Sequence, residues 1–227
     1  AAVVEVIDDL GGLDLNITQG EMNQINKYKK DVDGVTGKNT PNVTQYGLVH
    51  LDGTQATTYA RIRKLSGDDF KRASRQRIVL QAMLEKAKKA NPATLVKICN
   101  SVVDDISTTL SLDQMVSLAK DVTKYKISST TGFPTDLTTK NMPRCGDTVI
   151  PADLVTNVKK LHEYMFDDAT YTPSQTVQAI SDTIVNTTGI TADSAKINTS
   201  DYNETVGATG TDEIQKGSET TGGTNVQ

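Results

Sequence analysis

The arginines of this chain are concentrated in one short stretch. Five of the six lie within seventeen consecutive residues, at Arg61, Arg63, Arg72, Arg75 and Arg77. From residue 61 to residue 77 there are seven cations and two anions, a local balance of +5 in a chain whose net charge is −4. Arginine carries a planar fork of donors that matches phosphate or carboxylate oxygens in pairs, and it keeps its proton. The stretch therefore predicts an oxyanion site, first of all for a phosphorylated ligand.

A helix is expected to position three of the side chains in this stretch. Residues 68–89 have a helical pattern that begins with two aspartates as capping candidates, Asp68 and Asp69. The spacing i, i+3, i+4 places one set of side chains on a single face of its opening turns, namely Arg72, Arg75 and Gln76. Cations there oppose the helix dipole at roughly 0.3–1 kcal/mol each when exposed, while the helix terminus itself favours an anion.

Two further arginines of the stretch precede this helix. Arg61 and Arg63 bracket Ile62, so an extended backbone would place both side chains on the same side. The alternative interpretation of the whole stretch is a solvated basic face, with Asp68 and Asp69 as local partners. Arginines in the opening turns of the helix oppose its dipole, so their presence there favours the anion site over a solvated face.

The same residues carry a resemblance to a known family. The runs 50–56, 59–63 and 67–76 together resemble the closing motif of the LytR-CpsA-Psr family, L-x-G-x-x-A-L-x-Y-x-R-x-R followed by G-D-F-x-R-x-x-R-Q. Two positions depart from that pattern: Thr57 stands where leucine is usual, and an additional acidic residue precedes Phe70. Because both halves of the motif occur together, the resemblance is specific.

The resemblance implies an extracytoplasmic phosphotransferase that moves a glycopolymer from a polyprenyl-pyrophosphate carrier onto the peptidoglycan of a bacterial cell wall. The implied partners are the lipid-linked glycan, the peptidoglycan acceptor and the membrane, reached through an N-terminal anchor. The family's pyrophosphate-binding and catalytic arginines fall on Arg61, Arg63, Arg72 and Arg75. Its glutamine falls on Gln76, which is expected to orient a phosphate oxygen.

A second resemblance concerns the start of the chain. Residues 6–15 are similar to a V-D-x-L-G-G-V-x-V element that lies in the middle of the family's domain. This similarity leads us to expect that the membrane anchor and the first half of the domain lie upstream. The Mg²⁺ cofactor that the family implies would then be held by carboxylates of that first half, with no metal ligand in this chain.

The expected fold class is α/β, with a mixed sheet between helical layers. Residues 1–90 are expected to form the C-terminal portion of the catalytic domain, and residues 91–189 a helical continuation and extension. Residues 190–227 are rich in Thr, Ser, Gly and Asn and contain no leucine or phenylalanine. Such a composition buries too little apolar area to offset the entropy of ordering, so a disordered tail is expected there.

The two cysteines, Cys99 and Cys145, lie far apart in the sequence and form no metal motif. The extracytoplasmic compartment implied by the resemblance would permit a disulfide between them, tying an expected loop at 128–150 to the helix that contains Cys99. The alternative is two free thiols.

Two other functions remain as alternatives. An arginine cluster can grip a nucleic-acid backbone, but the net charge is −4 and no aromatic residues alternate with the arginines, so no nucleic-acid partner is expected. The other alternative is a module that binds a polyprenyl phosphate or a glycan without catalysing transfer.

Overall fold

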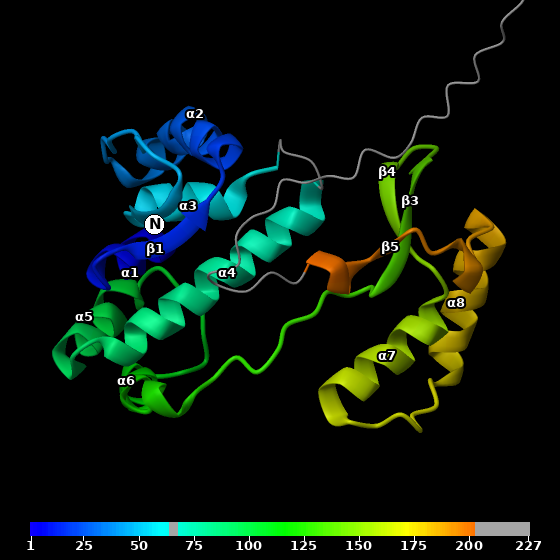
Figure 1. Ribbon diagram of the computed structural model, residues 1–227. Coiled ribbons are helices and arrows are strands. Elements are labelled where there is room, and N and C mark those ends of the chain that lie inside the picture. Colours follow the sequence, from blue (N-terminus) through cyan, green and yellow to red (C-terminus); the bar gives the residue numbers. More distant parts are fainter. Residues whose placement is uncertain (64–67, 203–227) are drawn as a thin grey trace, which may run out of the picture.

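The computed structural model describes residues 1–63 and 68–202, and they form two groups of elements that residues 125–135 connect along the chain. Figure 1 shows the first group around strands β1 (Leu13–Ile17) and β2 (Gly47–Leu51), and the second around β3 (Asp136–Met142) and β4 (Gly146–Pro151). Helix α4 (Asp68–Lys89) begins on the side of the second group, where it contacts the 3₁₀ turn Thr199–Tyr202, and runs back into the first group. The class is α/β, as predicted, but the described strands form two small antiparallel sheets and not one mixed sheet.

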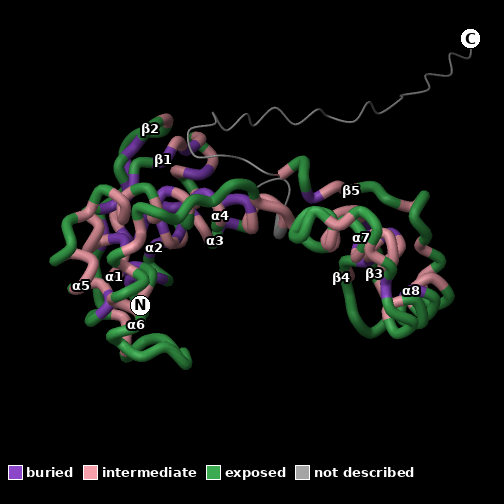
Figure 2. The backbone as a smooth tube through the Cα atoms, turned by 90° about the horizontal axis from the view of Figure 1, so that it is seen from below, coloured by how far each residue is buried: buried purple, intermediate pink, exposed green. Residues whose placement is uncertain are grey.

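Hydrophobic alternation explains the first sheet. Leu13, Leu15 and Ile17 are buried along β1, and Asp14 between them is exposed. The strand pairs with β2 in antiparallel register, so that Leu13 lies opposite Leu51. These side chains form the main core together with buried residues of helices α1 (Ala2–Asp9), α2 (Gln19–Thr36), α3 (Gly53–Arg61) and α4. Figure 2 shows this buried backbone in purple.

Helix α2 begins and ends at strong local signals. Thr18 accepts a hydrogen bond from the backbone N–H of Glu21, and the Glu21 carboxylate accepts one from the N–H of Thr18 at 3.0 Å. Gly37 ends the helix in the left-handed conformation, at φ 70°. From the sequence alone, residues 21–30 are expected to form a short polar helix and residues 31–46 a loop that contains Gly34, Gly37 and Pro41. The helix continues because Val32 and Asp33 are both buried on its inner face.

Helix α3 ends at Arg61 and so determines where Arg61 and Arg63 lie. Asp52 and Gln55 form a capping box at its start. At Gly53 the helix lies so close to α1 that a Cβ atom would be 2.2 Å from the carbonyl oxygen of Val4. The close approach therefore requires glycine at this position.

The remaining helices divide between the two groups. In the first group, α5 (Pro92–Val102) and α6 (Leu112–Lys120) follow α4, and a 3₁₀ turn (Val122–Lys124) leads towards the second group. In the second group, α7 (Leu154–Phe166) and α8 (Gln175–Thr188) pack on each other beside the β3–β4 hairpin (Figure 1). The predicted loop at 128–150 thus contains most of an antiparallel hairpin, whose strands place Leu137 and Ile150 in the interior.

The expectation of a disordered tail from residue 190 is wrong for its first part. Strand β5 (Ile197–Asn198) pairs antiparallel with β3, between the 3₁₀ turns Ala192–Ser194 and Thr199–Tyr202. Thr199 is buried, and its hydroxyl donates to the carbonyl oxygen of Gly132 at 3.0 Å. Backbone pairing and one buried threonine order a segment that is poor in apolar residues. Residues 203–227 lie outside the described residues.

No helix within residues 1–63 and 68–202 combines the length and apolar character needed to cross a membrane.

Candidate pyrophosphate-binding site

Two of the predicted arginines lie at the end of α3. The helix stops at Ile62, whose backbone turns to φ −58° and ψ 126° while its side chain is buried in the core. Arg61 and Arg63 on either side of it are exposed. Arg61 lies in the last turn of α3, where the helix dipole favours a cation. The buried isoleucine therefore anchors a segment that presents one arginine before it and one after it.

These two arginines line the same pocket, of about 170 Å³, between α3 and α2. The wall contributed by α2 contains an aromatic ring, a carboxylate and an aliphatic side chain, from Tyr28, Asp31 and Val32. Arg61 also borders a second hollow of about 410 Å³, which is lined mainly by residues 1–4 and the end of α2. With two guanidinium groups and one carboxylate, the smaller pocket has a local charge of +1, which suits an anion.

Arg75 does not line this pocket. Its side chain is 6% exposed, and its Nε donates to Glu21 Oε1 at 2.6 Å. Its Nη1 donates to the carbonyl oxygen of Ile62 at 3.4 Å, and its guanidinium carbon lies 6.0 Å from the ring centroid of Tyr59. Removing one partner of a buried ion pair costs about 3–5 kcal/mol because the other charge stays buried. Arg75 thus joins α4 to the start of α2 and to the end of α3.

The remaining members of the arginine stretch lie elsewhere on α4. Arg72 is half-buried and Gln76 is exposed. Arg77 is directed towards the second group of elements, where its Nη2 donates to the carbonyl oxygen of Tyr202 at 3.0 Å. Burial lowers the pKa of Arg77. Residues 64–67 and the side chains of Asp68 and Asp69 lie outside the described residues, and so does the predicted cap of α4.

Helix α2 supplies the part of the site that the sequence did not reveal. Thr18-x-x-Glu21 is a recognisable capping box, so the position of Glu21 at the start of a helix could have been predicted. Its partner could not, because Arg75 lies 54 residues further along the chain. Tyr28 and Asp31 carried no signal of their own.

The described residues do not fit a Mg²⁺ site. No group of three or more His, Cys, Asp or Glu side chains that could hold a metal ion occurs within 1–63 and 68–202. Magnesium is held through carboxylates in near-octahedral geometry. We therefore derive no chemical step through a metal at this pocket.

The expected disulfide between Cys99 and Cys145 is absent, and both thiols are free. Cys99 is buried on α5 in the first group, whereas Cys145 is exposed in the turn between β3 and β4 in the second group (Figure 1). A disulfide requires Cα atoms within about 7 Å, and the placement of the two elements prevents that approach.

This chain belongs to the LytR-CpsA-Psr family, since it matches the LytR_cpsA_psr family over residues 1–160. It is 28% identical over 123 residues to the polyisoprenyl-teichoic acid–peptidoglycan teichoic acid transferase TagU of Enterococcus faecalis, covering 53% of this chain and 35% of that protein. It is also 28% identical over 116 residues to the corresponding transferase TagV of Bacillus subtilis, covering 50% of this chain and 27% of that protein. The chain spans about a third of the length of these curated relatives.

Two solved structures are also similar to the chain. One is TagT bound to LIIa-WTA, with a TM-score of 0.47 at 22% identity, covering 83% of this chain and 58% of that chain. The other is TagV of B. subtilis, with a TM-score of 0.49 at 20% identity, covering 76% of this chain and 62% of that chain.

Proposed function

We propose that this chain is part of a phosphotransferase that moves a glycopolymer from a polyprenyl-pyrophosphate carrier onto peptidoglycan. The observation that carries the proposal is that Arg61 and Arg63 are both exposed and line one pocket. Family membership and relatives named as teichoic acid transferases support the same chemistry. Under this proposal the protein works at the extracytoplasmic face of the membrane, with a lipid-linked glycan and peptidoglycan as partners.

The site residues have separate roles in this proposal. Arg61 and Arg63 bind the pyrophosphate oxygens through paired donors and stabilise the charge that develops on the leaving lipid phosphate. Arg72 and Gln76, near the start of α4, are the additional contacts that the family motif suggests. In-line phosphoryl transfer depends mainly on positioning and on such charge stabilisation. Mg²⁺ remains part of the proposal as a cofactor, with its ligands outside the described residues.

Geranylgeranyl pyrophosphate is a suitable test ligand, because it combines an isoprenoid chain with a pyrophosphate. Its binding is measured by calorimetry for the parent chain and for two variants, Arg61→Lys and Arg61→Ala. If paired donors matter, lysine should weaken binding nearly as much as alanine, by roughly tenfold or more, because a charge-assisted hydrogen bond contributes about 1.5–3 kcal/mol.

Lys89→Ala is the matched control, since Lys89 is exposed at the opposite end of α4. The same proteins are titrated with a 20-base-pair DNA duplex. A diffuse basic surface would be shown if Arg61→Lys bound like the parent while Lys89→Ala lost as much affinity as Arg61→Ala. Tight DNA binding by the parent would then favour the nucleic-acid alternative.

A further inference from the structure

The carboxylate of Glu21 connects two elements of the site. Glu21 lies in the first turn of α2 and is buried, and its carboxylate accepts a hydrogen bond at each oxygen. Oε2 accepts the backbone N–H of Thr18 at 3.0 Å, which caps α2, and Oε1 accepts Nε of Arg75 at 2.6 Å. Each oxygen is therefore held by a different element, one by the start of its own helix and one by α4.

Arg75 extends this connection to the pocket. Its Nη1 donates to the carbonyl oxygen of Ile62, the residue between the two arginines that line the pocket. Ile62 is where α3 ends, so its peptide group sets the direction in which the chain leaves the helix. The contacts form a continuous path from Glu21 through Arg75 to the backbone that carries Arg61 and Arg63.

Burial argues against a direct role for Arg75 in holding the ligand. Its side chain is 6% exposed and that of Glu21 is 10% exposed, so a phosphate could reach the guanidinium only by displacing a buried carboxylate. The displaced charge would then need a new partner, which is unfavourable in a poorly solvated site.

We infer that Glu21 is a positioning residue of the pyrophosphate site, acting through Arg75 to hold Arg61 and Arg63 in the geometry that binds the ligand. The inference rests on the proposed function, because it concerns the ligand of that pocket. It assigns Arg75 to positioning the site, with ligand contact left to the two exposed arginines.

The direction in which Glu21→Gln changes the affinity for the ligand distinguishes a positioning role from simple electrostatics. Glu21→Gln removes a negative charge near a cationic pocket, and Coulomb attraction alone would then make the pocket bind an anion more tightly. Glutamine keeps the shape but weakens the hold on Arg75. If Glu21 positions the site, geranylgeranyl pyrophosphate should bind about tenfold more weakly, which corresponds to one lost charge-assisted hydrogen bond.

A double variant that removes both charges, called the neutral pair below, separates an effect on ligand binding from a folding defect. Glu21→Gln with Arg75→Met leaves no unpaired buried charge, so we expect its melting temperature to stay near that of the parent while its affinity falls by a similar factor. Lys89→Ala is again the control and should bind as the parent does. Tighter binding by Glu21→Gln would overturn the inference and indicate that Glu21 competes with the ligand. Parent-like affinity in the neutral pair would overturn it as well.

A second measurement does not depend on ligand affinity. Hydrogen exchange of the Ile62 amide, which donates to the carbonyl oxygen of Tyr59 at 3.2 Å, reports the order of the end of α3. Exchange there should be at least about tenfold faster in the neutral pair than in the parent, while amides in α5 stay unchanged. Failure of the parent to bind the ligand would count against the proposed function. Unchanged exchange at Ile62 would count against positioning by Glu21.

The Nε–H resonance of Arg75 in nitrogen-15 spectra tests direct ligand contact. It should be visible in the free parent protein and shift little on adding geranylgeranyl pyrophosphate, because its acceptor stays Glu21. Resonances of Arg61 and Arg63 should shift. The reverse pattern would assign ligand contact to Arg75 and overturn its positioning role.

Discussion

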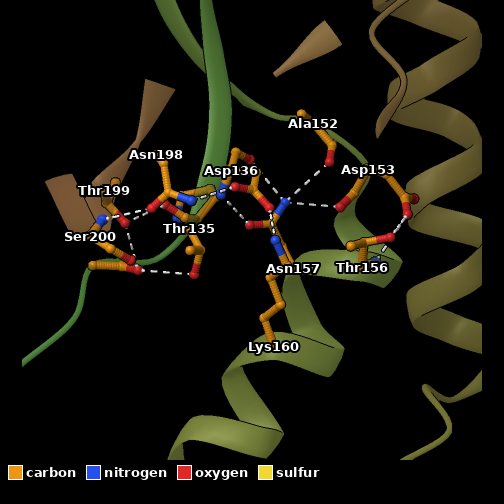
Figure 3. Close-up of polar contacts among 12 residues, drawn as sticks. Thr135, Asp136, Ala152, Asp153, Thr156, Asn157, Lys160, Asn198, Thr199 and Ser200 are labelled. Atoms are coloured by element: carbon orange, nitrogen blue, oxygen red, sulfur yellow. Dashed lines mark hydrogen bonds and ion pairs between the residues drawn. The ribbon is translucent and has the colours of Figure 1, made fainter. Parts of the chain in front are cut away.

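The side-chain amide of Asn157 makes two hydrogen bonds with the backbone of Asp136, with Oδ1 accepting the N–H at 2.9 Å and Nδ2 donating to the carbonyl oxygen at 2.9 Å (Figure 3). Nδ2 also donates to the carbonyl oxygens of Ala152 at 3.3 Å and Asp153 at 2.9 Å. Asn157 has no exposed surface. One buried amide thus joins the start of β3, the chain after β4 and the first turns of α7.

Asn157→Ala should destabilise the second group of elements. The substitution leaves the backbone N–H of Asp136 without its partner, and a buried unsatisfied group costs about 1–3 kcal/mol. The carbonyl oxygens of Asp136 and Asp153 lose one donor each but keep the backbone N–H groups of Ala152 and residue 157. For a chain of this size, a loss of 1 kcal/mol lowers the melting temperature by about 2–4 °C. Thermal unfolding measures the effect. Asn141→Ala, at an exposed position on β3, is the control and should melt near the parent; equal melting of both variants would contradict this role.

Two glycine substitutions should have opposite effects on stability. A Cβ atom on Gly132 would lie 2.9 Å from Cβ of Thr199, so Gly132→Ala should displace the 3₁₀ turn that follows β5 and lower the free energy of unfolding. Gly34 lies inside α2, and no atom lies within 4 Å of the place that an added methyl group would take, so Gly34→Ala should be neutral or stabilise by about 0.5–1 kcal/mol. Urea unfolding compares the two. A stabilising Gly132→Ala would mean that residues 197–202 do not pack on residue 132.

Acid should weaken the fold through Asp33. Burial raises the pKa of this carboxyl group, but hydrogen bonds from the Thr40 amide and hydroxyl, with the charge of Lys29, outweigh it and hold the pKa below its usual value. A carboxyl group whose pKa is lower when folded stabilises above its unfolded pKa of about 3.9, and the contribution is lost as pH falls through the folded pKa.

Asp33→Asn measures this contribution. The difference in free energy of unfolding between parent and variant should be largest near pH 7. It should shrink below about pH 4, because the parent then loses the stabilisation by the ionised carboxylate, which the variant lacks at every pH. Urea unfolding at several pH values between 3 and 7 tests this. Asp113→Asn, at an exposed position on α6, should match the parent throughout. A difference that stays constant with pH would assign the effect of Asp33 to hydrogen-bond geometry alone.

The two thiols should differ strongly in reactivity. Burial raises the pKa of Cys99, so little thiolate forms there, whereas Cys145 is exposed. Ellman's reagent should detect one fast thiol in the native protein and two after denaturation, and Cys145→Ser should remove the fast one. Detection of no thiol under non-reducing, denaturing conditions would reveal the disulfide that the structure lacks.

Features that depend on residues close together along the chain could be predicted without the structure. The concentration of arginines, the family motif and the cap of α3 at Asp52 are all set by spacings of a few residues, and a capping box needs only a hydroxyl or carboxylate and a glutamate or glutamine three positions apart. The apolar alternation of β1 likewise sets which side chains enter the core. These features could be predicted because their physical causes are local.

Which arginines face a pocket and which are buried depends instead on how the helices pack against one another. A guanidinium group matches a carboxylate as well as a phosphate, so residue type and spacing do not distinguish Arg75 from Arg61. The distinction arises because α2 brings Glu21 against α4. In the same way, β5 is ordered because it pairs with the edge of β3, a strand more than fifty positions earlier in the chain. Contacts between distant segments depend on how whole elements pack, and no short sequence pattern records that packing.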